Sequence, residues 1–348
     1  PFDPYEFSSN GITRTSASNT ASIQLFSDLG SRGGNELSLS FSRTRDQSDP
    51  VGEFPQVEAA LKSPAQALTE TRPVRIGAQF FAQQNDLTQT SVRLSNTVTL
   101  ARGKSTWTMG LVGSWLGIQH EYLPGALGEW YFPSWIDILN NAPQRYQRSV
   151  LLEGNSPGIS FNILEAGGYV QNQIELGRGL TVRVGVRVDA PFTLDQPEEN
   201  ERVRSFFNRS TSDLPSGMVL FSPRLGFNWQ TGGDLKTQLR GGVGIFTGQL
   251  PYVWLSNAFH NNGLRSVTQV CYGRRTSDPL EGNTSPPFNP TPPPLGCLAG
   301  VPTSVRAVTI FDYGFVYPQY AKMSVSLDRE ITPGLSASIG GIFTHSIN

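Results

Sequence analysis

Residues 180–189 read Leu180-Thr181-Val182-Arg183-Val184-Gly185-Val186-Arg187-Val188-Asp189. Leucine or valine stands at every even position, while threonine, arginine, glycine and aspartate stand at the odd ones. A β-strand has a two-residue side-chain period, so it would place the aliphatic side chains on one face and both arginines on the other. A helix would scatter them around its circumference. The segment therefore predicts an amphipathic β-strand.

The same alternation recurs in pairs of segments joined by short turns that contain glycine. Two such segments with a tight turn between them predict a β-hairpin. The pairs are 20–29 with 36–45, 90–101 with 105–118, 166–176 with 180–189, 221–230 with 235–246, and 319–330 with 335–345. Together they predict about ten long antiparallel strands.

The connections between hairpins are long, at residues 46–89, 119–165, 190–220 and 247–318. Outer-membrane barrels combine short periplasmic turns with long extracellular loops, and their strands need about 9–11 residues to cross the bilayer. We therefore predict an all-β fold, a segment of an antiparallel transmembrane β-barrel. Within the loops we expect short helices at 56–62 and 134–139, with Ser134 as N-cap, a further strand within 74–84, and extended chain at 285–294.

A soluble β-sandwich is the alternative, because it would bury the apolar face and expose the charges. Two observations disfavour it. The loops are long for a compact sandwich, and aromatic residues lie toward strand ends, as interfacial girdles require. These aromatic residues are Trp107, Trp115, Phe227, Trp229 and Phe343.

The polar face of the predicted strands carries charged side chains that we expect to face the barrel lumen. They could guide a solute, pair across strands, or contact a plug domain, and we favour the plug. The residues expected there are Arg93, Glu175, Arg183, Arg187, Asp189, Arg224, Lys236, Arg240, Lys322 and Asp328.

Composition excludes several function classes. The 348 residues include 27 basic and 28 acidic side chains, so no global field would attract nucleic acid. No apolar run reaches the roughly 18 residues of a membrane-spanning helix. The histidines His120, His260 and His345 lack metal-ligand spacing, and no hydrolytic motif is present. We expect no metal, no cofactor and no enzymatic activity.

Cys271 and Cys297 lie in the same proline-rich stretch. We favour a disulfide that staples this loop in an oxidising compartment, and two free thiols are the alternative.

Several segments resemble TonB-dependent outer-membrane receptors. Tyr169–Gln173 followed by Leu180–Asp189 is similar to that family's "YVQD-x-W" and "LTLN-x-G-x-RYD" hairpin, although Asn172 replaces the usual Asp and Ile174 the usual Trp. Phe221–Phe227 resembles the "SPRLG" strand and Leu239–Phe246 the "LRGGYGIFY" strand. The Ala101–Ser105 turn is similar to the "TRGKH" turn of the Oar-like subgroup.

This resemblance implies a 22-stranded barrel in the outer membrane of a Gram-negative bacterium, in contact with its lipid. It also implies a plug domain that couples uptake to the TonB complex. The plug and TonB box are absent from these residues, and the sequence starts at Pro1 and stops directly after a predicted strand. We therefore expect residues 1–348 to be a single barrel segment truncated at both ends.

The first functional hypothesis is uptake or binding of a large extracellular solute. The second is a surface adhesin or assembly component with the same barrel and no transport, and the third is a soluble all-β binding domain. Exposed aromatic residues suit ligand contact, and the alternative, which we favour, is that they pack the loops against each other. The candidates are Trp130, Tyr131, Phe132, Trp135, Tyr252 and Trp254.

Overall fold

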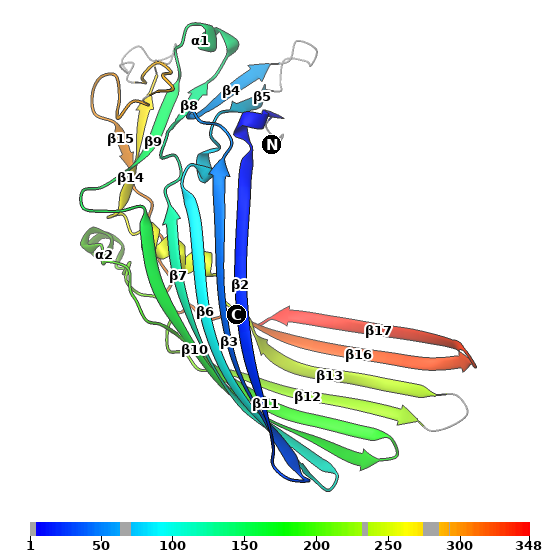
Figure 1. Cartoon of the computed structure of the whole chain (residues 1–348). Helices are drawn as coiled ribbons and strands as arrows, with labels where there is room; N and C mark the ends of the chain where they lie inside the picture. The colour runs from blue at the N-terminus through cyan, green and yellow to red at the C-terminus, as the bar shows by residue number, and fades with distance from the viewer. Residues whose placement is uncertain (1–4, 63–70, 232–235, 274–284, 292) are drawn as a thin grey trace.

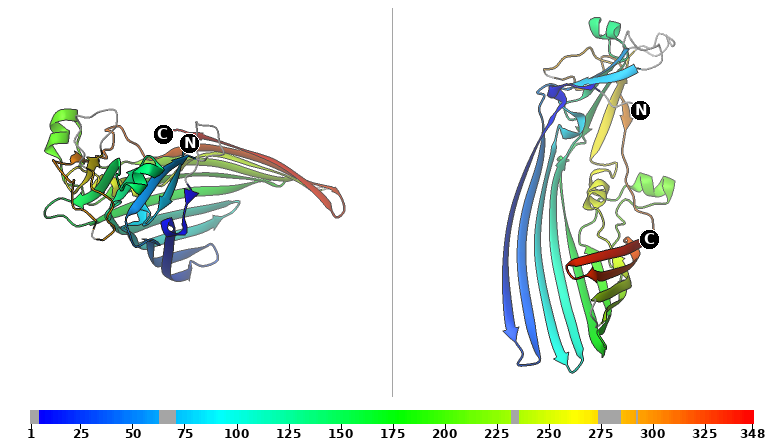
Figure 2. Two further views of the ribbon diagram at one scale, coloured as in Figure 1. Left: turned by 90° about the horizontal axis from the view of Figure 1, so that it is seen from above. Right: turned by 90° about the vertical axis from the view of Figure 1, so that its right-hand side faces the viewer.

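The computed structural model of the chain describes residues 5–62, 71–231, 236–273, 285–291 and 293–348. Within these residues the strands form two sheets (Figure 1), which we call the wall sheet, with ten strands, and the loop sheet, with seven. The wall sheet is open and strongly bent, and the loop sheet lies beyond one end of its strands (Figures 1 and 2).

Every neighbouring pair in the wall sheet is antiparallel, and chain order is kept across the sheet. The predicted fold class and the five hairpins are confirmed. The strands are β2 (Ile12–Asp28), β3 (Gly33–Pro50), β6 (Asn85–Arg102), β7 (Ser105–Tyr122), β10 (Gly158–Gly177), β11 (Leu180–Thr193), β12 (Leu220–Thr231), β13 (Thr237–Thr247), β16 (Gln319–Thr332) and β17 (Leu335–Ser346). Several run further into the long connections than the sequence predicted. The turn at 232–235 lies outside the described residues.

Glycine is required at the turn between β10 and β11. Gly179 has φ +75°, which L side chains rarely adopt, and a Cβ there would lie 1.9 Å from the carbonyl oxygen of Gln230. This close approach lets the hairpin pack against the end of β12.

The strand register gives the wall sheet two chemically different faces. Arg183 is opposite Gly226, which is opposite Gly242, so these positions share a face that we call the inner face. Val184, Leu225, Val243 and Met323 are opposite one another on the other side, the outer face. Leu225, Val243 and Met323 are 49%, 49% and 54% exposed. Apolar side chains left uncovered along a whole face are suited to lipid.

The outer face also marks the two edges of the membrane. Trp107 and Trp115 lie eight positions apart on this face of β7, with Met109 and Leu111 between them. At roughly 3.3 Å per residue, eight positions span about 26 Å along the strand, and the tilt of about 40° that is usual in outer-membrane barrels projects this to about 20 Å, most of their apolar band of about 25 Å. These tryptophans occupy the places of two aromatic girdles.

The two faces should respond differently to a new charge at adjacent positions. Val325 lies on the outer face of β16 and Ser324 on the inner face. We expect Val325→Arg to cost about 2–4 kcal/mol, since a guanidinium would enter the lipid. Ser324→Arg is the matched control and should assemble normally. The yield of folded, heat-modifiable protein in outer membranes measures the effect, and equal yields would contradict the assignment of the faces.

The loop sheet gathers segments from three long connections and the N-terminal region. Its order is β1 (Tyr5–Glu6), β5 (Thr71–Ile76), β4 (Gln56–Lys62), β8 (Glu129–Phe132), β9 (Arg145–Leu151), β14 (Ser266–Tyr272) and β15 (Thr303–Val305). The predicted helix at 56–62 is wrong, because this segment is β4 and pairs with β5 and β8. Long-range pairing overrides the weak local preference of a short segment.

The remaining elements are short. The predicted helix at 134–139 is confirmed as α1 (Trp135–Leu139), where the Ser134 hydroxyl accepts the Asp137 N–H. The strand expected within 74–84 is β5, which ends at Ile76 and is followed by η2 (Phe80–Ala82). Among the described residues, four helical segments were not predicted: η2, η1 (Ser8–Asn10), α2 (Glu201–Phe207) and α3 (Tyr252–His260).

Candidate functional site

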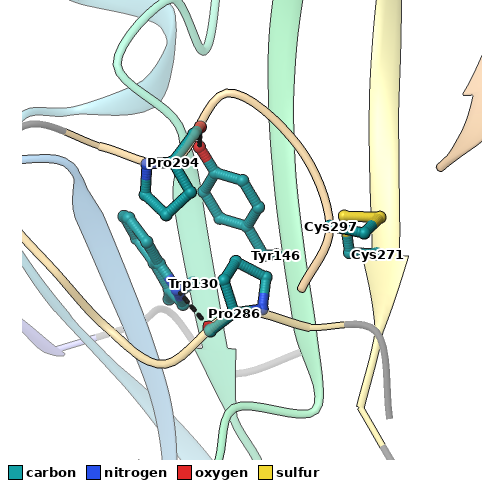
Figure 3. Close-up of a disulfide and its surroundings, with 6 residues drawn as sticks. All are labelled: Trp130, Tyr146, Cys271, Pro286, Pro294 and Cys297. Atoms are coloured by element: carbon teal, nitrogen blue, oxygen red, sulfur yellow. Dashed lines mark hydrogen bonds between the residues drawn. A yellow bond between two sulfur atoms is a disulfide. The ribbon is translucent and has the colours of Figure 1, made fainter. Parts of the chain in front are cut away.

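The aromatic core of the loop sheet holds the proline-rich segment in place (Figure 3). The Trp130 and Tyr146 rings lie 4.4 Å apart, centroid to centroid. Trp130 Nε1 donates to the Pro286 carbonyl at 3.0 Å, and the Tyr146 hydroxyl donates to the Pro294 carbonyl at 2.6 Å. Trp130 and Phe132 are buried here, which is the packing role that the sequence analysis gave as the alternative to ligand contact.

A disulfide ties the same segment to the loop sheet. Cys271 on β14 is bonded to Cys297, as expected from the sequence, and these are the chain's two cysteines. Cys271 belongs to the same buried cluster as Trp130 and Tyr146. The proline-rich segment is therefore held by a covalent bond and by side-chain hydrogen bonds that include those of Trp130 and Tyr146.

A buried carboxylate joins the strands of the loop sheet. Glu129 accepts hydrogen bonds from Gln56 at 2.6 Å and Gln147 at 2.5 Å, and forms an ion pair with Arg145 at 3.3 Å. Burial raises the pKa of Glu129, and the Arg145 guanidinium partly offsets this. The sequence analysis missed this network, because its members come from distant segments.

Helix α3 packs on the inner face of the wall sheet, alongside the upper parts of β7 and β10 (Figure 1). Phe161, Ile163 and Glu165 follow one another at every second position of β10, so their side chains lie on one face. Glu165 is opposite Ser114, and Ser114 is opposite Arg93, which places this face with the predicted inner-face charges. The Phe161 and Phe259 rings are stacked 4.7 Å apart. The inner face is thus apolar where α3 covers it.

A cavity of about 190 Å³ lies against the inner face beside this contact. Its lining includes Arg93, Glu165, Arg187, Asp189 and Tyr317. Arg187 and Asp189 form an ion pair at 2.7 Å, and the Tyr252 hydroxyl of α3 donates to Glu165 at 3.3 Å. Two predicted inner-face arginines are therefore brought together with two carboxyl groups that come from neighbouring strands.

The other predicted inner-face charges lie nearer the short turns. Arg240 forms an ion pair with Asp328 at 3.0 Å. Arg183 donates to Gln173 at 2.7 Å, while Arg224 and Lys322 both lie over the Phe246 ring. Glu175 lies close to the turn between β10 and β11, and Lys236 directly precedes β13. Among the described residues, no carboxylate forms an ion pair with Arg93, Arg183, Arg224 or Lys322.

The comparison with protein families decides the class of this chain. Residues 2–348 match the family model described as "Outer membrane beta barrel domain". The chain belongs to this family. It is therefore a protein of the Gram-negative outer membrane, and the soluble alternative is wrong. No helix of the described residues is long and apolar enough to cross a membrane.

A solved structure has a similar fold. The outer membrane transporter YddB from Escherichia coli superposes with a TM-score of 0.52 at 9% identity, covering 99% of this chain and 36% of YddB. This chain thus spans about a third of that transporter. Two further structures are more distant. The siderophore receptor PirA from Pseudomonas aeruginosa has a TM-score of 0.37 and 12% identity, covering 93% of this chain and 45% of PirA. The RagAB peptide importer has a TM-score of 0.31 and 9% identity, covering 95% of this chain and 40% of the importer chain. No curated protein sequence matches the chain.

The remaining loop aromatics of this family member differ in exposure. Trp135 and Trp254 are 59% and 48% exposed. Tyr131 and Tyr252 are half-buried, and the Tyr252 hydroxyl donates a hydrogen bond to Glu165. Burial and the nearby Glu165 carboxylate raise the pKa of Tyr252, so its hydroxyl stays protonated and donates. Trp135 and Trp254 remain the candidates for contact with an extracellular ligand.

Proposed function

We propose that this chain forms part of the wall of a TonB-dependent receptor of the Oar-like subgroup, which takes up or binds a large solute. The solute would be captured by the extracellular loops and would pass along the inner face. A plug domain of the same receptor would couple this step to the TonB complex. No covalent chemistry is required of the chain.

The main support is that several charged side chains of the inner face have no ion-pair partner among the described residues. Arg93, Arg183, Arg224 and Lys322 share this face, and the ion pairs among the described residues leave all of them without a carboxylate partner. If the sheet served only as a barrel wall, these charges would stay unpaired. An acidic plug surface or an anionic solute would pair with them.

Depletion of solutes from the medium tests the proposal, because it detects uptake of whichever solute the receptor recognises. Spent medium is compared by mass spectrometry for the wild-type strain, a strain without the gene for this chain, and a strain without TonB. We expect at least one large solute to remain in the medium of both deletion strains. A solute that remains only without the receptor gene would contradict TonB coupling.

The surface-adhesin alternative has a different outcome in the same strains. It is favoured by α1, which exposes Trp135, Ile136 and Leu139 together. In that case, removing the receptor gene would abolish attachment of cells to a surface and leave depletion of every solute unchanged.

A further inference from the structure

Two buried histidines form the contact between α3 and β7. His120 lies on β7, and its Nδ1 is 2.6 Å from the Ser256 hydroxyl of α3. His260, at the end of α3, meets the His120 ring edge to face, with centroids 5.0 Å apart. Tyr122 stacks on His120 at 5.4 Å and also meets the His260 ring at 5.9 Å, so the three rings contact one another. The helix is thus held to the inner face by imidazole rings as well as by the Phe161–Phe259 stack.

His260 is neutral in this contact. Its Nε2 is buried and has no hydrogen-bond partner among the described residues. A neutral imidazole has one donor and one acceptor nitrogen, and a second proton would create a buried cation. Burial, the nearby His120 and the Arg265 guanidinium lower the pKa of His260 to about 3.

The groups around His260 offer no compensation for a positive charge. On α3 the neighbour is the neutral Ser256, and on β7 it is His120 with Tyr122. On β6, the Asn85 Oδ1 atom lies 3.4 Å from His120 Nε2, and the Asp86 carboxylate forms an ion pair with Arg45. Arg265, which follows α3, is a further cation, bonded to the carbonyls of Ser156 and Gly158. Among these neighbours no carboxylate contacts His260.

We propose that the His120–His260 contact is an acid-released latch, which holds α3 on the inner face at neutral pH and frees it when the external pH falls. Release would remove α3 from the lumen and uncover Ile118, Phe161 and Ile163. This inference depends on the position of α3 in the barrel and not on the proposed transport.

The sign follows from the two states of His260. A released histidine has an ordinary pKa near 6.5, whereas the docked one has a pKa of about 3. The docked state binds fewer protons, so its stability is complete above about pH 6.5 and falls as the pH drops from there toward 3. At pH 5.0 this corresponds to a roughly 30-fold shift toward release.

Hydrogen–deuterium exchange on the purified protein in detergent micelles tests the latch. At pH 7.5 and pH 5.0, after correction for intrinsic exchange rates, the amides of α3 should lose protection by roughly 30-fold at the lower pH. The amides of α1, which contains no histidine, should keep theirs. Equal protection of α3 at both values, or parallel loss in α1, would overturn the proposal.

Two variants assign the effect to His260. In His260→Leu, the change in protection of α3 between the two pH values should be much smaller than in the wild type, because only His120 of this contact can still take up a proton. His345→Gln, at an exposed position on β17, should behave as the wild type. A His260→Leu protein that is folded by heat modifiability and retains the wild-type pH dependence would reject the latch. If this variant does not fold, the wild-type comparison of α3 with α1 still decides.

Discussion

Trp130→Ala is expected to destabilise the loop sheet by about 3–5 kcal/mol, because a large buried aromatic side chain leaves a cavity that its neighbours cannot fill. Trp130 is fully buried between Tyr146 and Phe288, and its indole N–H anchors the proline-rich segment. Loss of this side chain should expose β8 and β9 to proteolysis, while the wall sheet keeps its heat-modifiable form.

The matched control is Trp135→Ala. Trp135 is 59% exposed on α1, so its removal should change stability by no more than about 0.5 kcal/mol. Rates of limited proteolysis in the loops, measured for both variants and the wild type, separate the two cases. Equal cleavage rates for Trp130→Ala and Trp135→Ala would show that Trp130 does not hold the loop sheet together.

Phe259→Ala is expected to weaken docking of α3 on the inner face by about 3–5 kcal/mol, because Phe259 stacks on Phe161 within the buried cluster of the inner face. Exchange at the α3 amides should then be fast at neutral pH, where the wild-type helix is protected. Phe206→Ala on α2 is the control, since Phe206 is 82% exposed. Unchanged protection of α3 in Phe259→Ala would mean that the aromatic stack contributes little.

The wall sheet could be predicted because its signals are local. In segments such as 180–189 the side-chain alternation repeats within ten residues, and the tight turns join strands that are neighbours in the sequence. The register follows from each turn, so the face shared by Arg183 and Arg224 could be assigned from the alternation alone. The Cys271–Cys297 pair could likewise be proposed from its loop context.

The loop sheet could not be predicted, because its strands pair across long separations. Gln56–Lys62 contains two alanines and a leucine, which favour a helix locally, yet the segment pairs with Glu129–Phe132, more than seventy positions away. The burial of Trp130 depends on the same pairing and on the proline-rich segment that crosses it. Exposure of an aromatic residue in a long loop therefore cannot be deduced from its position in the sequence.

The sequence by itself determined the amphipathic strands, their hairpins and the division of Leu180–Asp189 into a lipid face and a charged face, since a two-residue period acts within one strand. Only the tertiary structure decided what lies against the charged face. Ile159, Phe161 and Ile163 continue the inner-face positions as apolar residues, and they are explained by α3, which arrives from a loop about ninety residues later. The contact between His120 and His260 has the same origin, because side chains 140 positions apart meet only when that loop folds back into the barrel.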